Sequence, residues 1–271
     1  MVYFSFMVLL CATTNALDLW ISPPWSMPSN RESWLEYYTK AAEMVDSRFD
    51  RIIVEISYPS QVLSDGSKPF SMEGIVVTSF FPQVVGTDVY LDVCLDDEEC
   101  RGNWIQDDES DAIRKVFEYV SSLENAKISG IITTLEHVGK ILGPEHNPYE
   151  NVSEYKAGFP GITFGTIISY SDLFIVNTAP NLFNSVDDIY LDMGTVLDYW
   201  ERLVNPSVER YAERIIQRCN RYRSTLRNSK MRYRWSSVSQ IEFEAMKLQL
   251  CQSGVFDPFK HALYDDALIP I

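Results

Sequence analysis

Hydrophobic and polar positions alternate in two six-residue stretches that repeat one pattern. Asp88-Val-Tyr-Leu-Asp-Val93 and Asp188-Ile-Tyr-Leu-Asp-Met193 share four identical residues. In an extended strand, the Asp, Tyr and Asp side chains line one face, while aliphatic or thioether side chains line the other. Both stretches are predicted to be strands. Their polar faces are candidates for a functional site, because α/β enzymes place their chemistry at the carboxyl ends of parallel strands.

Apolar strand patterns alternate with amphipathic helix patterns over most of the chain. The region from about residue 195 is predicted to be mainly helical, with an apolar stripe and ten Arg or Lys residues between 202 and 234. A capping box at Ser29 and Glu32 begins a helix of about 16 residues, and a second helix is expected over 107–124. The predicted strands, in addition to the repeated pattern, are 18–22, 51–57, 74–81, 128–135, 162–169 and 173–176.

This alternation predicts an α/β fold with a mostly parallel sheet. Strands that are apolar on both faces are typical of sheets covered by helices. A (β/α)8 TIM-barrel-like fold suits the length of the chain and its six to eight candidate strands. The alternative is a doubly wound open sheet with a helical C-terminal extension.

The first residues have the pattern of a secretory leader. Residues 1–16 are mostly apolar and end in Thr14-Asn-Ala16, although they carry no Lys or Arg. We therefore expect a signal peptide over 1–16, a single α/β domain over 17–271, and a secreted, extracellular protein. No later stretch has eighteen apolar residues without charges, so no membrane span is expected.

Cysteine spacing fits an oxidising compartment. The expected mature chain keeps four cysteines, for which proximity favours the pairs Cys94–Cys100 and Cys219–Cys251. The only glycosylation sequon begins at Asn151, in a polar loop where modification is expected.

Charge and the absence of motifs limit the function classes. The formal net charge of −15 argues against nucleic acid as a partner. No phosphate-binding or dinucleotide-binding glycine motif occurs, and the three histidines lack metal-ligand spacing. No cofactor and no metal are expected. The basic residues of the helical region fit either a patch for a polyanion or a solvated helix face.

Carboxylates at strand ends are the remaining candidates for chemistry. Glu55, Asp92, Glu136 and Asp192 each lie in or directly after a predicted strand. Two carboxyl groups in different surroundings can divide the roles of acid and base, and glycoside hydrolysis is commonly built in this way. We predict Glu136 as the proton donor, with Asp92 or Asp192 as its partner.

Aromatic side chains suggest the ligand class. Flat rings near strand ends suit sugar rings, and the predicted substrate-binding residues are Trp20, Trp25, Trp104, Tyr170 and Tyr190. One hypothesis is a carbohydrate-active hydrolase, similar to glycoside hydrolases, with paired carboxylates within about 10 Å of each other. The other is a non-catalytic protein that binds a glycan or protein on an enzyme-like barrel. The expected partner is a carbohydrate or other small polar ligand, and neither hypothesis predicts an oligomeric state.

Overall fold

The structure is a computed structural model of the chain. It describes residues 17–22, 31–46, 48–57, 61–62, 70–71, 80–84, 86–94, 128–134, 156–157, 159–178, 186–196, 207–235, 240–257 and 260–264. The predicted leader over 1–16, the predicted helix over 107–124 and the sequon at Asn151 lie outside the described residues.

Eight parallel strands form a closed barrel. They are β1 (Leu17–Ile21), β2 (Phe49–Ser57), β5 (Asp88–Cys94), β6 (Ile128–Thr134), β7 (Thr163–Ile168), β8 (Asp188–Asp192), β9 (Met231–Trp235) and β10 (His261–Tyr264). Each strand pairs with the next barrel strand along the chain, and β10 returns to pair with β1. The predicted (β/α)8 fold is therefore confirmed, and the open sheet is excluded.

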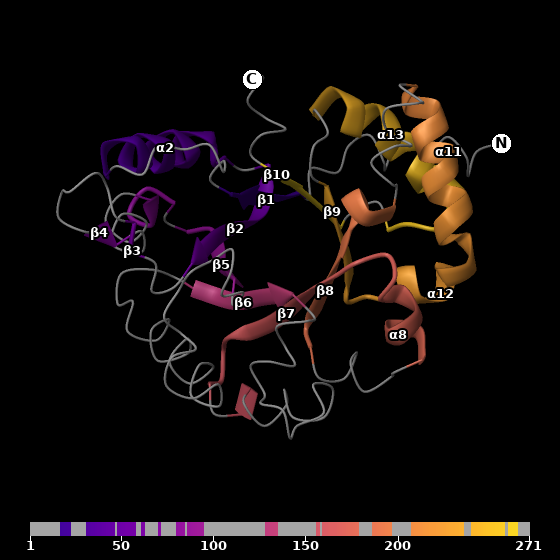
Figure 1. The fold of residues 1–271 in the computed structure, drawn as a ribbon, viewed down its shortest axis with the longest axis horizontal. Helices are drawn as coiled ribbons and strands as arrows, with labels where there is room; N and C mark the ends of the chain where they lie inside the picture. Colours follow the sequence, from indigo (N-terminus) through magenta and orange to yellow (C-terminus); the bar gives the residue numbers. More distant parts are fainter. Residues whose placement is uncertain are drawn as a thin grey trace.

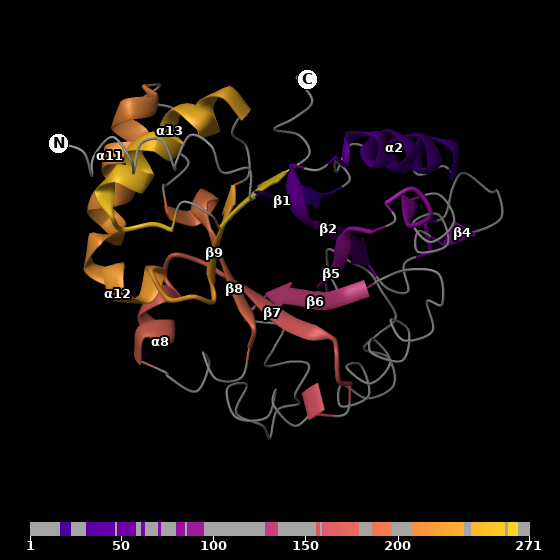
Figure 2. The same cartoon turned by 180° about the vertical axis from the view of Figure 1, so that it is seen from behind.

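The described helices lie against the outside of the barrel, as Figures 1 and 2 show from opposite sides. They are α2 (Arg31–Met44), α8 (Leu173–Thr178), α11 (Val208–Cys219), α12 (Arg223–Leu226) and α13 (Gln240–Ser253), with 3-10 turns η3 (Met193–Val196) and η4 (Asn220–Tyr222). The short strands β3 (Gln61–Val62) and β4 (Phe70–Ser71) pair antiparallel outside the barrel. None of these described helices combines the length and the apolarity that a membrane crossing requires.

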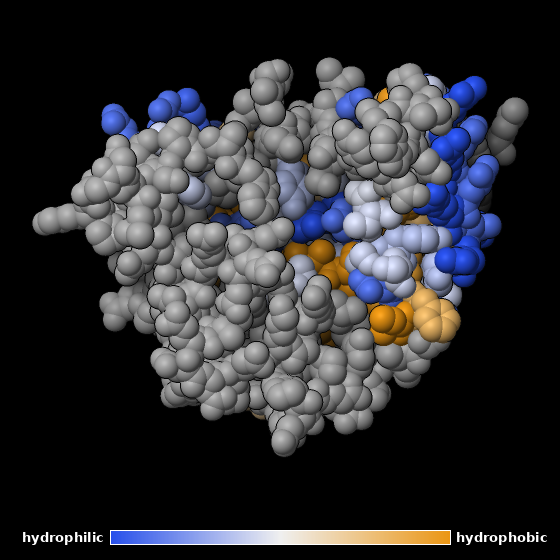
Figure 3. All heavy atoms as spheres, in the orientation of Figure 1, coloured by the Kyte–Doolittle hydropathy of each residue, from blue (hydrophilic) through white to orange (hydrophobic). Residues whose placement is uncertain are grey.

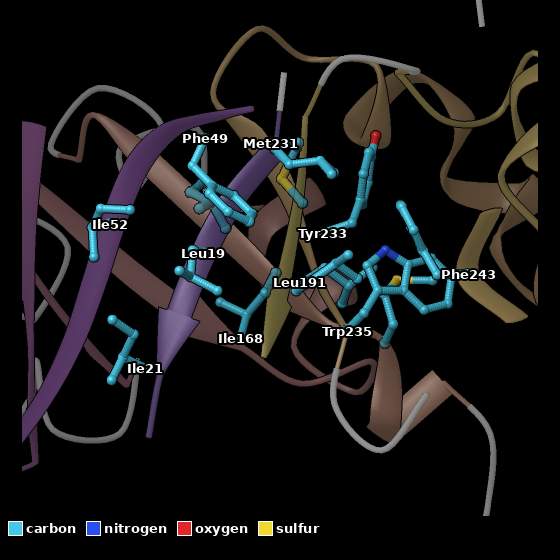
Figure 4. Close-up of a cluster of buried hydrophobic side chains, with 14 of the residues drawn as sticks. Leu19, Ile21, Phe49, Ile52, Ile168, Leu191, Met231, Tyr233, Trp235 and Phe243 are labelled. Atoms are coloured by element: carbon cyan, nitrogen blue, oxygen red, sulfur yellow. The ribbon is translucent and has the colours of Figure 1, made fainter. Parts of the chain in front are cut away.

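Seven of the eight barrel strands contribute buried apolar side chains to two separate cores, and β9 contributes to one of them. Outward-facing side chains such as Leu19, Ile52 and Leu191 pack beneath the helices, where Phe243 of α13 meets Trp235 of β9 (Figure 4). A second buried cluster comprises Trp20, Ile53, Tyr90, Ile132, Ile167, Tyr190 and Ala262. Because strand residues alternate between faces, this second cluster fills the interior of the barrel.

The amphipathic pattern of the C-terminal region is confirmed in α11. Ala212, Ile215 and Cys219 of α11 are buried, whereas Arg210 and its neighbour Glu209 are exposed. Figure 3 shows hydrophilic side chains along the outer edge of the molecule at α11. However, this region is not only helical, because it also supplies the barrel strands β9 and β10.

The predicted strand over 173–176 is wrong, since these residues begin α8. The backbone carbonyl of Asp172 accepts a hydrogen bond from Val176 N–H at 2.9 Å, which starts the helix. The β-branched sequence favours a strand, but parallel β7 and β8 need a crossover connection between them. Of the predicted strand over 74–81, the described residues Phe80 and Phe81 are buried but belong to no barrel strand.

The predicted disulfide between Cys219 and Cys251 is not formed. Both residues are buried thiols on the packed helices α11 and α13. A buried cysteine on each of two packed helices is not enough to form a disulfide. The bond also requires Cα atoms within about 7 Å of each other and side chains that converge. Cys100 of the other predicted pair, Cys94–Cys100, lies outside the described residues.

Candidate active site at the carboxyl end of the barrel

The repeated Asp-Tyr-Asp pattern points into the barrel from β5 and β8. Tyr90 and Tyr190 belong to the interior cluster, so the aspartates two residues before and after each tyrosine face the interior as well. Asp88 and Asp188 lie toward the N-terminal ends of the strands, and Asp92 and Asp192 toward the C-terminal ends. The interior cluster, which includes the aromatic rings of Trp20 and Tyr90, thus separates two groups of polar side chains.

The N-terminal group is an ionic cluster, here called the basal cluster: Asp18, Arg51, Asp188, Tyr190 and Arg232. Asp188 accepts hydrogen bonds from Arg51 Nη1 at 2.6 Å and from Arg232 Nε at 2.8 Å. Asp18 accepts from Arg232 Nη1 at 3.1 Å and from the Tyr190 hydroxyl at 3.0 Å. Arg51 on β2 and Asp188 on β8 lie on strands that are not neighbours, so they meet through the interior.

The basal cluster pairs two carboxyl groups with two guanidinium groups, although burial outweighs the nearby arginines at Asp18 and raises its pKa. Burial raises the pKa of Asp188, but Arg232 and Arg51 outweigh it and lower the pKa below its usual value. Arg51 also lies 4.7 Å from the centre of the Tyr90 ring, which adds a cation–π contact. Because its charges satisfy one another, we assign the basal cluster to stability and not to chemistry.

The C-terminal group, here called the mouth, comprises Ser22, Glu55, Asp92, Asp192, Arg234 and Tyr264. Glu55 on β2 and Asp92 on β5 are register partners on adjacent strands. Glu55 accepts a hydrogen bond from the Ser22 hydroxyl at 2.5 Å, which orients its carboxylate. All members except Asp92 are partly exposed, so a ligand at this end of the barrel would meet them.

The carboxyl group of Asp92 has a pKa well above the usual value for an aspartate. Its side chain is buried, and this burial is the main cause that raises its pKa; the negative charge of Glu55 raises it further. Arg234 and the Trp20 indole oppose the shift, and the resulting pKa is about 8. Asp92 therefore keeps its proton at neutral pH, beside a second carboxyl group.

Arg234 contacts three side chains at or next to the mouth: Asp192, Trp20 and Tyr264. Its Nη2 donates a hydrogen bond to Asp192 Oδ2 at 2.9 Å, and Asp192 Oδ1 also accepts the Gly194 N–H at 2.8 Å. The Arg234 guanidinium carbon lies 5.0 Å from the Trp20 ring centre and 5.5 Å from that of Tyr264. Asp192 is thus held by a salt bridge to Arg234 and by a turn at Gly194. Among the described residues, neither Asp92 nor Glu55 forms a salt bridge.

The structure brings together only part of the predicted site. Asp92 and Asp192 lie at the same end of the barrel and both act on Arg234. Glu136, two residues beyond β6, lies outside the described residues, as do Trp25 and Trp104.

Three of the aromatic side chains predicted to offer a flat face to a sugar are packed within the protein instead. Trp20 and Tyr190 are fully buried inside the barrel, where they pack edge to face, so neither ring offers a free face to a sugar. Tyr170 donates its hydroxyl to the Arg218 carbonyl and packs against Tyr222, on the helix layer outside the barrel. Each of these three rings lies near a strand end but packs against other side chains of the protein.

Sequence reasoning missed the arginines of the barrel interior. It assigned Arg232 and Arg234 to a helical basic region, but both lie on β9 and face inward. The signal that identifies them is the alternation Met231-Arg-Tyr-Arg-Trp235, in which the three apolar residues are buried and the two arginines partly buried. Glu55 was recognised as a strand-end carboxylate but not as the partner of Asp92.

Metal ligation has no support within the described ranges, where no three His, Cys, Asp or Glu side chains form a group able to hold an ion. Among the described residues, the polar groups of the mouth are carboxyl groups, one guanidinium, one phenol and one alcohol.

No protein-family model and no curated protein sequence matches the chain. Among solved structures, the xylanase-alpha-amylase inhibitor protein XAIP-I in complex with trehalose is 12% identical, with a TM-score of 0.50; the match covers 94% of this chain and 95% of that one. XAIP-II from Scadoxus multiflorus is 12% identical over 92% of each chain, with a TM-score of 0.48. A putative deoxyribose-phosphate aldolase from Toxoplasma gondii ME49 is 11% identical, with a TM-score of 0.48, over 96% of this chain and 91% of its own. The first similarity and the closed parallel barrel show that this chain has the (β/α)8 barrel fold.

Proposed function

We propose that the protein is a secreted, carbohydrate-active hydrolase whose acid–base pair is Asp92 and Glu55. The observation that carries this proposal is the raised pKa of Asp92, about 8, next to the carboxylate of Glu55. Two neighbouring carboxyl groups whose surroundings separate their protonation states can act as acid and base at the same pH. Asp92 is the proton donor, and Glu55 is the nucleophile or base.

The register of the two strands suits a retaining mechanism. Adjacent strands lie about 4.8 Å apart, and the two carboxyl groups of retaining glycosidases lie about 5 to 5.5 Å apart. Asp92 gives its proton to the glycosidic oxygen as the bond to the anomeric carbon breaks, while Glu55 forms a bond to that carbon. Water then displaces Glu55 and gives a proton back to Asp92.

Two further considerations support the carbohydrate class. The XAIP-I structure, of the same fold, contains trehalose. Glu136, which follows β6 next to β5 in the barrel, remains a candidate for an additional carboxylate on sequence grounds. Secretion is inferred from the leader pattern alone; expression in a secretory host, with sequencing of the new amino terminus, tests cleavage after Ala16.

The experiment is a hydrolysis screen on neutral polysaccharides and chromogenic glycosides. Glu55→Gln and Asp92→Asn are each expected to reduce turnover by at least about 100-fold, the contribution of a positioned acid or base. Asp88→Asn is the matched control, because it makes the same change on the same strand at the other end of the barrel. Equal losses in Asp88→Asn and Asp92→Asn would refute the assignment.

A non-catalytic carbohydrate-binding protein is the second candidate. It is favoured by the packing of Arg234 against Trp20 and Tyr264, whose rings stack with centres 5.9 Å apart and so fill much of the interior. This function predicts saccharide binding by the wild type without release of reducing ends from any substrate that it binds.

A further inference from the structure

Two buried donors in the barrel interior have no hydrogen-bond partner among the described residues. They are Arg234 Nε and Trp20 Nε1. The Trp20 indole and the Arg234 guanidinium are both close enough to Asp92 to lower its pKa. Both donors therefore lie beside the Asp92 carboxyl group, next to the mouth.

Buried donors of this kind are rare, because each loses its interaction with water and gains nothing in return. Arginine and tryptophan nitrogens can only donate, so the group that satisfies them must be an acceptor such as an oxygen atom. The Arg234 side chain is held in place by Asp192 and by two aromatic rings, which leaves its Nε no freedom to turn toward water. A ligand oxygen that accepts from these donors would complete their hydrogen bonding.

The charges around these two donors determine whether a neutral or an anionic oxygen is favoured there. The single positive charge of Arg234 is paired with Asp192. Glu55 adds a negative charge, and Asp92 is protonated at neutral pH. These groups leave no uncompensated positive charge for an anionic ligand. The whole chain, with a net charge of −15, also repels polyanions.

We propose that Arg234 Nε and Trp20 Nε1 bind an uncharged oxygen of a saccharide, and that the mouth therefore selects neutral sugars over sugars with carboxylate or sulfate groups. Arg234 is a substrate-orienting residue in this arrangement. The inference rests on the proposed carbohydrate function, but it requires binding only and not turnover.

The test is calorimetric binding to the Asp92→Asn protein, in which turnover is suppressed and the charge of the mouth is kept, because Asp92 is protonated at neutral pH. The probes are trehalose, xylo-oligosaccharides and malto-oligosaccharides as neutral sugars, with oligogalacturonates and sulfated disaccharides as acidic ones. We expect neutral sugars to bind at least tenfold more tightly than acidic sugars. Adding Arg234→Lys, which keeps the charge but loses the Nε donor, is expected to weaken neutral-sugar binding about tenfold, as is Trp20→Phe.

Arg221→Lys is the matched control, because Arg221 also lies over two rings, those of Tyr170 and Tyr222, but outside the barrel. It should leave affinity unchanged, and thermal melting confirms that each variant is folded. Tighter binding of acidic sugars, an unchanged affinity in Arg234→Lys, or no binding of any probe would overturn the inference. Binding of neutral sugars without hydrolysis by the wild type would refute only the hydrolase. Hydrolysis of acidic sugars would refute only the selectivity.

Discussion

Replacing Asp188 with asparagine removes the carboxylate that joins both arginines of the basal cluster. Asp188 contacts Arg51 at 2.6 Å and Arg232 at 2.8 Å, and its side chain is 10% exposed. Asparagine keeps the shape but leaves two largely buried guanidinium groups without this partner. Removing one partner of a buried ion pair costs about 3 to 5 kcal/mol. For a domain of this size, we expect the melting temperature to fall by about 10 °C.

The dependence of this loss on pH follows from the direction of the pKa shift. The pKa of Asp188 in the folded protein is below the usual 3.8, because Arg232 and Arg51 outweigh the effect of burial. Its ionised form therefore stabilises the fold at neutral pH, and this stabilisation is lost as the pH falls below 3.8. The difference in unfolding free energy between wild type and Asp188→Asn should shrink in acid.

Urea unfolding followed by circular dichroism at pH 7 and at pH 3 measures both effects. Glu36→Gln is the control, since it also breaks a salt bridge, to Lys40, but between side chains that are 64% and 65% exposed. Such exposed pairs contribute little, so no measurable change is expected there. A loss in Asp188→Asn no larger than in the control, or one of the same size at both pH values, would refute the role given to the basal cluster.

Further predictions concern the mouth and the packing of the interior. Hydrolysis should decline as the pH rises through about 8, because Asp92 loses its proton; a pH–rate profile that stays flat to pH 10 would contradict its role as acid. Glu55→Gln should lower the pKa of Asp92, because it removes a negative charge beside it, and carbon-13 NMR titration of the aspartate carboxyl groups would show this shift. Gly130→Ala should destabilise the fold by about 1 to 3 kcal/mol, because the new Cβ would lie 2.4 Å from the Tyr90 ring; chemical denaturation measures this, and an unchanged midpoint would count against the packing.

The strand patterns at 88–93 and 188–193 were predictable because their alternation is local. A period of two specifies which side chains share a face, and burial on both faces specifies a sheet covered by helices. The same reasoning placed Asp92 and Asp192 at one end of the sheet. The structure confirms the eight-stranded parallel barrel that these patterns favoured.

The Asp92–Glu55 pair was not predictable, because it depends on the register between two strands that are separated by more than thirty residues. The sequence shows that each carboxylate lies in a strand, but not that they are opposite each other. The strand β9 was missed for a related reason. Its two arginines resemble a solvated helix face until the aspartates of β1 and β8 are known to neutralise them.

The interior cluster between the basal cluster and the mouth has a consequence for how this scaffold can change. Substitutions at Glu55 or Asp192 can alter the ligand without touching the salt bridges of Asp18 and Asp188, because the buried interior cluster around Trp20 and Tyr90 lies between the two groups. Selection for a new specificity and selection for thermal robustness would therefore act on different residues. A protein engineer could diversify the mouth in a library while leaving every basal residue fixed, and most members of such a library should still fold.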